Sequence, residues 1–236
     1  MRLHAISATD YIAHYDNERE AFKSRRRTRE WTAPALARLG VSAPARVLFV
    51  GSGNGIEVLG LREVGYDAWG IDMRPPLPAA SPWCRVGDAT KPVFVDGEFD
   101  VVLALEVIEH IGGDYNGDEP MSLVRRRFAS ELRRVGRLIV LATPNRWFPL
   151  DEHGQNRFQI RVHSPFNDAT FTIGELRELF LPREWGVIPY AGYFQLEKVK
   201  RLHIPARPIH AALRLFSNRR LHQSPFNPHL FVWFRF

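Results

Sequence analysis

Cysteine, long apolar runs and a leader-like start are all missing or scarce in this chain of 236 residues. Cys84 is the only cysteine, so an internal disulfide is excluded, and we expect a reducing, cytoplasmic compartment. No stretch approaches the roughly 18 consecutive apolar residues of a membrane-spanning helix, so we expect no membrane span. Residues 1–16 contain no apolar run, so we also expect no secretory signal. The remaining composition, 45% hydrophobic and 25% charged, is typical of a globular protein.

Positive charge is concentrated at one end of the chain. The formal net charge is +6, and residues 197–236 carry a large excess of Lys and Arg over Glu197, their single acid. Basic segments attract nucleic acid, anionic substrates or membrane surfaces. A solvated surface produces the same pattern, so charge alone leaves the partner undecided.

Hydrophobic patterning predicts a helical extension followed by an α/β domain. We assign residues 1–40 to the helical extension, which could form a lid, and residues 41–236 to the domain. Short apolar runs that alternate with helical patterns predict a doubly wound, mostly parallel sheet with helices on both faces. The predicted strands are 46–50, 68–71, 83–86, 99–105, 137–142 and 230–236, and the predicted helices are 56–64, 121–135 and 173–180.

The segment 143–172 is too long for a simple connection, so we interpret it as a loop on the substrate side of the domain. It contains the aromatic residues Trp147, Phe148, Phe158 and Phe166 among polar ones. These side chains could stack on a planar substrate or anchor the loop to the domain, and the sequence does not decide between the two.

A glycine-rich turn lies between the first predicted strand and the first helix of the domain, at residues 51–55. Glycines allow a tight turn and a close approach of a ligand to the backbone. Asp72 follows about 20 residues later, at the end of the second strand, where a carboxylate can accept hydrogen bonds from ribose hydroxyls. The dinucleotide pattern G-x-G-x-x-G requires glycine at position 56, and this chain has Ile56 there.

With these residues the chain resembles the class I S-adenosylmethionine-dependent methyltransferases. The resemblance covers roughly residues 45–145 and is carried by the segments 47–55, 70–72, 87–89 and 99–110. It implies a Rossmann-like, seven-stranded sheet with an antiparallel C-terminal strand. It also implies S-adenosyl-L-methionine as the cofactor, so residues 41–236 would be the methyltransferase domain.

The resemblance assigns roles around that cofactor. It implies that the glycine turn lines the methionine part and the sugar, that Asp72 binds the ribose, and that Asp88 binds the adenine amino group beside the Ala89 N–H. The predicted cofactor-binding residues are Gly51, Ser52, Gly53, Asn54, Asp72, Met73, Asp88, Ala89, Leu105 and Glu106. Phe49 departs from the family, which usually has an acid at that position.

Transfer of the methyl group needs alignment, and an oxygen acceptor must also lose a proton to a base or to a metal-bound site. Glu106, Glu109 and His110 follow the fourth strand at the edge where α/β sheets bind ligands. Three interpretations remain open. These residues have structural roles, or His110 or His163 is the catalytic base, or Mg²⁺ or Mn²⁺ is held by Glu106, Glu109, His110 and His163.

The E-x-x-E-H spacing with a later histidine is similar to that of small-RNA 3′-terminal 2′-O-methyltransferases and of ubiquinone-biosynthesis O-methyltransferases. We therefore expect O-methylation of a small metabolite or a sugar-bearing biosynthetic intermediate. The alternatives are metal-dependent 2′-O-methylation of RNA and a non-catalytic domain that binds the cofactor. Base N-methylation is disfavoured because residues 143–147 lack the second proline of the Pro-Pro-aromatic motif.

Overall fold

The computed structural model describes residues 26–91, 93–112, 119–149, 170–189, 211, 214–216 and 218–236. Three predictions fall partly or wholly outside these residues: most of the extension at 1–40, most of the loop at 143–172, and His163 within that loop.

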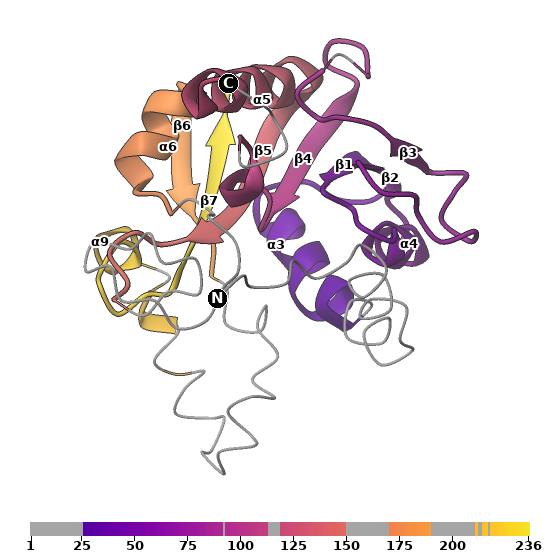
Figure 1. The fold of residues 1–236 in the computed structure, drawn as a ribbon. Coiled ribbons are helices and arrows are strands. Elements are labelled where there is room, and N and C mark those ends of the chain that lie inside the picture. Colours follow the sequence, from indigo (N-terminus) through magenta and orange to yellow (C-terminus); the bar gives the residue numbers. More distant parts are fainter. Residues whose placement is uncertain are drawn as a thin grey trace, which may run out of the picture.

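A seven-stranded sheet forms the centre of the molecule, in the order β3-β2-β1-β4-β5-β7-β6 (Figure 1). The strands are β1 (Arg46–Val50), β2 (Asp67–Asp72), β3 (Cys84–Val86), β4 (Phe99–Leu105), β5 (Gly136–Pro144), β6 (Glu184–Val187) and β7 (His229–Arg235). β7 runs antiparallel to both of its neighbours, while the pairs among β1 to β5 are parallel. The predicted Rossmann-like fold is confirmed, although the pattern analysis did not detect β6.

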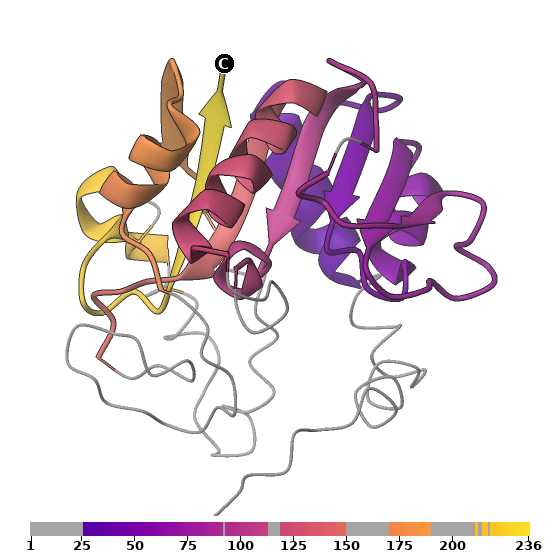
Figure 2. The ribbon, with the colours of Figure 1, turned by 45° about the horizontal axis from the view of Figure 1, so that its top comes forward.

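Helices cover both faces of the sheet because successive strand residues point to opposite sides. Val102 and Ala104 pack beneath α5 (Met121–Val135) and α6 (Ile173–Phe180), in one apolar cluster. Val101 and Leu103 belong to a second cluster on the other face. That face is covered by the π-helical turn η1 (Thr28–Thr32), α3 (Ala33–Arg38) and α4 (Ile56–Glu63), and Figure 2 shows the two layers.

The described part of the N-terminal segment belongs to the hydrophobic core. Trp31 is 4% exposed, its ring meets Phe231 edge-on at 5.3 Å, and its indole N–H donates to the Pro189 carbonyl at 2.9 Å. Two arginines of this segment, Arg27 and Arg29, form ion pairs with glutamates of α4. Their positive charges are therefore balanced within the fold.

Two short elements complete the described fold, the 3₁₀ turn η2 (Ile108–His110) after β4 and α9 (Arg219–His222) before β7. Among the described helices, none is both long and apolar enough to cross a bilayer.

His222 in α9 ties that helix to β7 from a fully buried position. Its Nε2 accepts the Phe231 N–H at 2.7 Å, which leaves Nδ1 protonated to donate to the Phe216 carbonyl. Burial lowers the pKa of His222 to about 4, and the bond to Phe216 opposes this only in part. The ordinary pKa of histidine is about 6.5. Between that pH and pH 4, the unfolded chain therefore binds a proton at His222 that the folded chain does not bind.

The free energy of unfolding should fall by about 3 kcal/mol through His222 alone as the pH drops from 7 to 4. His222→Gln should be less stable than wild type at pH 7, because it loses the paired ring, but its stability should fall less steeply with pH. Urea unfolding of both proteins at several pH values measures this difference. Parallel pH profiles would show that His222 is not held neutral in the fold.

Candidate active site

The glycine turn after β1 combines tight packing with an open surface. Gly51, Gly53 and Gly55 have φ values of +69°, +53° and +83°, which side chains other than glycine rarely adopt. A Cβ at Gly51 would overlap the Val107 side chain, and one at Gly55 would overlap Ala80. A Cβ at Gly53 would meet no atom of the described residues within 4 Å, so these residues leave the backbone there open to a ligand.

Asp72 ends β2 with its carboxylate turned toward this glycine turn. Oδ2 accepts the Gly53 N–H at 2.8 Å, and Oδ1 accepts the Arg74 N–H at 2.9 Å. Because each carboxylate oxygen has two lone pairs, both can still accept a ribose hydroxyl. The structure thus places the Asp72 carboxylate beside the glycine turn, and its binding of a ribose stays a prediction.

Asp88 follows β3 on the far side of Asp72. Its Oδ1 accepts the Thr90 N–H at 2.9 Å and the Thr90 hydroxyl at 2.7 Å, and Oδ2 lies 3.3 Å from Lys91 Nζ. Burial raises the pKa of Asp88, but the bonds from Thr90 and the charge of Lys91 outweigh burial and leave the pKa below its usual range. Asp88 is therefore an ionised acceptor. The next residue, Ala89, is half-buried, and Met73, which follows β2, is exposed.

Glu106 begins the turn that follows Leu105, the buried last residue of β4. Its φ is +58°, uncommon outside glycine, and its N–H donates to the Ala142 carbonyl of β5 at 3.0 Å. Strained backbone of this kind persists where surrounding contacts hold it, and is common at functional sites.

The two glutamates at this turn each contact a side chain from another strand, Glu106 one from β7 and Glu109 one from β5. Glu106 Oε2 lies 3.3 Å from His229 Nε2, and Glu109 is 2% exposed with its Oε2 accepting the Thr143 hydroxyl at 3.1 Å. Burial raises the pKa of Glu109 well above its usual range, and the adjacent negative charge of Glu106 raises it further. The two carboxyl groups therefore favour a shared proton.

His229 is the residue that the sequence analysis missed. As the first residue of β7 it pairs with Pro144, the last residue of β5. An antiparallel strand brings its amino end to the edge where the parallel strands end, so residues 229 and 106 meet although they are distant in sequence. A predicted antiparallel last strand was the available signal, since it places its first residues at this edge.

The predicted metal ligands are only partly brought together. Glu106 and Glu109 are neighbours, whereas the His110 side chain is exposed. Within the described residues, no three His, Cys, Asp or Glu side chains form a group that could hold a metal ion. Since His163 lies outside those residues, its proposed roles as base or ligand stay predictions.

The Phe49 side chain packs in the hydrophobic core. It is 2% exposed and belongs to the cluster that contains Trp31, Leu103 and Leu105. The position at which the family usually has an acid is therefore occupied here by an apolar side chain, which packs between the sheet and the helices that cover one of its faces.

The strand order lines these groups up along one edge. Because β3, β2, β1 and β4 are adjacent, Asp88, Asp72, the glycine turn and Glu106 follow one another across the carboxyl edge. This series fits a long ligand with a base at one end, a sugar in the middle and an amino-acid chain at the other. Along this edge, Asp88 and Asp72 are acceptor carboxylates, and the Gly53 N–H already donates to Asp72.

Comparisons with known proteins agree with this fold. The family model described as a methyltransferase domain matches residues 14–186. A Burkholderia thailandensis 1,6-didemethyltoxoflavin-N1-methyltransferase, solved with its substrate and S-adenosylhomocysteine, is 17% identical with a TM-score of 0.52, over 100% of this chain and 92% of that chain. A protein in complex with the Haloferax volcanii Trm112 methyltransferase activator is 17% identical with a TM-score of 0.57, over 96% and 97%. No curated protein sequence matches the chain.

Proposed function

Because the chain belongs to the S-adenosylmethionine-dependent methyltransferases, we propose that it methylates an oxygen atom of a small metabolite or a sugar-bearing intermediate. Membership confirms the class I resemblance, and the protein is an enzyme whose cofactor is S-adenosyl-L-methionine. The contact between His229 and Glu106 is the single observation that carries the choice of an oxygen acceptor.

The cofactor would be held by the residues along the carboxyl edge. Asp88 and the Ala89 N–H would bind the adenine, Asp72 the ribose hydroxyls, and Gly53 the methionine part beside Leu105. When bound, the cofactor supplies a methyl carbon activated by its sulfonium. Transfer from such a centre requires little from the protein beyond alignment and exclusion of water.

Removal of the acceptor proton is the part of the reaction for which this chain supplies groups. A hydroxyl is a weak nucleophile until a base takes its proton. His229 Nε2 lies 3.3 Å from Glu106 Oε2, so a proton taken by the ring at Nδ1 would leave Nε2–H donating to this carboxylate, which would orient the ring and stabilise the imidazolium. Glu109, buried and bonded to Thr143, limits the negative charge beside Glu106 by favouring a shared proton.

Paired acceptors test the proposal directly. We expect S-adenosylhomocysteine to form with a hydroxyl compound, such as a phenol or a sugar, and not with the matching amine. A base-dependent transfer should also proceed equally fast in the presence of a chelator, because a side-chain base takes the proton without a metal ion.

Two results would contradict this proposal. Turnover lost on chelation and restored by Mn²⁺ would support the metal-dependent alternative that includes His163. Turnover with RNA alone, weakening steeply as salt is raised, would support the nucleic acid alternative.

A further inference from the structure

Arg125 is a half-buried cation with a fixed orientation on α5. Its Nε–H donates to the Ile111 carbonyl at 2.9 Å, and its guanidinium carbon lies 5.1 Å from the centre of the Phe171 ring. These two contacts fix the guanidinium plane and use one of its five N–H donors. Among the described residues, no carboxylate forms an ion pair or hydrogen bond with Arg125.

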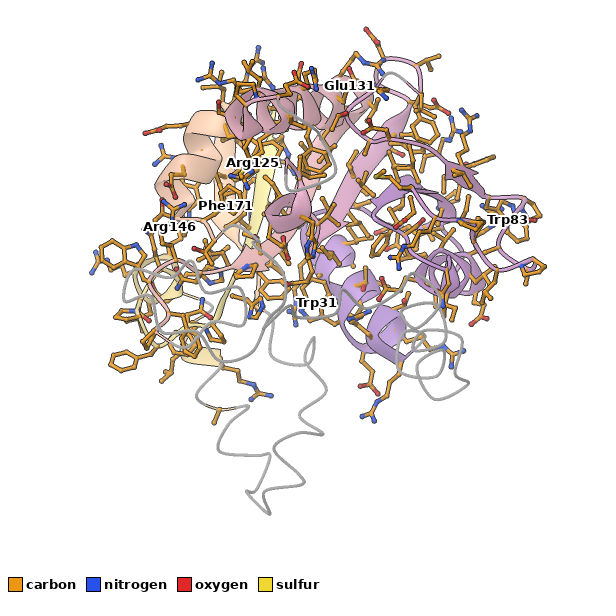
Figure 3. All side chains as sticks on the ribbon, in the orientation of Figure 1. Trp31, Trp83, Arg125, Glu131, Arg146 and Phe171 are labelled. Carbon is orange, nitrogen blue, oxygen red and sulfur yellow. The ribbon has the colours of Figure 1, made fainter. Side chains whose placement is uncertain are left out.

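A second arginine lies close to the first. Arg146 follows β5, and its backbone N–H donates to the Phe171 carbonyl at 3.0 Å. The Phe171 backbone N–H in turn donates to the Pro144 carbonyl at 3.1 Å. This short ladder fixes Phe171 and Arg146 relative to the sheet. Figure 3 shows Arg125, Phe171 and Arg146 in succession along one side of the molecule.

The local acid does not balance both arginines. Glu175 pairs with Arg146 through Oε1, and its Oε2 accepts the N–H and hydroxyl of Thr172 at the start of α6. Burial lowers the pKa of Arg125, and the like charge of Arg146 lowers it further, while the negative charge of Glu175 opposes both only in part. A partly desolvated guanidinium beside a second cation is costly unless an anion completes the site.

We propose that Arg125, supported by Phe171 and accompanied by Arg146, binds an oxyanion carried by the methyl acceptor, a carboxylate or a phosphate. Arginine presents paired N–H donors that match both groups. Arg125 contacts Ile111, directly after η2, and Arg146 directly follows β5, so the proposed anion site lies on the β5 side of Glu106. The predicted cofactor-binding residues lie on the other side, from β3 to β4. This inference rests on the proposed function, because it assigns the anion to the acceptor and not to the cofactor.

Binding of small probes tests the site without any turnover. Benzoate and phenyl phosphate carry the two oxyanions, and benzamide is a neutral counterpart. With S-adenosylhomocysteine present, calorimetric or NMR titration of wild type should give tighter binding of at least one anion than of benzamide. Which anion binds more tightly distinguishes a carboxylate acceptor from a phosphorylated one.

Arg125→Gln should weaken binding of that anion by about 10-fold or more, with benzamide unchanged, because a charge-assisted hydrogen bond is lost. Arg126→Gln, an exposed neighbour on the same helix with the same change in charge, should bind as wild type. Arg125→Lys keeps the charge without the fork and should fall between them, which also covers the case in which Arg125→Gln fails to fold.

The inference is overturned if wild type does not distinguish the anions from benzamide, or if Arg125→Gln and Arg126→Gln bind them equally. Neither outcome depends on which atom is methylated, so failure of O-methylation in the acceptor assay would be recognised separately.

Discussion

Replacing His229 with glutamine should lower kcat for methyl transfer to an oxygen acceptor by about 10²- to 10⁴-fold, the usual contribution of general base catalysis. Glutamine retains a hydrogen-bonding group opposite Glu106 but cannot accept the acceptor proton. The affinity for S-adenosylmethionine should remain unchanged, since its proposed contacts lie on β1 to β4 and not on β7. Single-turnover kinetics and cofactor titration of the same preparation separate the two effects.

His110→Gln is the matched control, because it makes the same chemical change at an exposed histidine of η2. His110 is also a candidate base because it follows the fourth strand, so the comparison decides between the two histidines. If His110→Gln loses activity while His229→Gln retains it, the base is His110 and the His229 assignment is wrong.

Most of the sheet could be predicted because its inner strands are buried on both faces and therefore read as continuous apolar runs. The predicted strand at 99–105 coincides with β4, and that at 46–50 coincides with β1. β6 was missed because the strand has only four residues, Glu184–Val187, and most of them are not buried. Its place in the sheet depends on pairing with β7, which follows more than 40 residues later along the chain.

The candidate site residues also fall into two groups, those whose position follows from local sequence and those whose position depends on pairing with distant segments. Asp72 could be predicted at this edge because it ends a parallel strand, and Asp88 was expected there through the family resemblance. The contacts of both with a cofactor stay predictions. The predicted antiparallel last strand indicates that its first residues lie at this edge, but the contact of His229 with Glu106 also depends on the register of that strand with β5, which the sequence does not give. The stack of Arg125 on Phe171 was likewise beyond local pattern, because it joins α5 to the segment that enters α6.

Loss of the Asp72 carboxylate should have the largest effect on cofactor binding. Hydrogen bonds to a charged group contribute about 1.5–3 kcal/mol each, so losing two ribose bonds should weaken binding by about 100-fold or more. Asp72→Asn keeps one oxygen for the Gly53 or Arg74 N–H, and so tests the charge with less disturbance of the glycine turn. Asp67→Asn is the matched control, an ion-paired aspartate at the opposite end of the same strand.

The binding isotherm of S-adenosylmethionine for wild type, Asp72→Asn and Asp67→Asn is the most direct test of where the cofactor's sugar is held. We predict saturable binding to wild type, a matching isotherm for Asp67→Asn, and a large rise in the dissociation constant for Asp72→Asn alone. Equal affinity of a folded Asp72→Asn and wild type would mean that the ribose is bound elsewhere, and that the alignment of base, sugar and amino-acid chain along this edge is wrong.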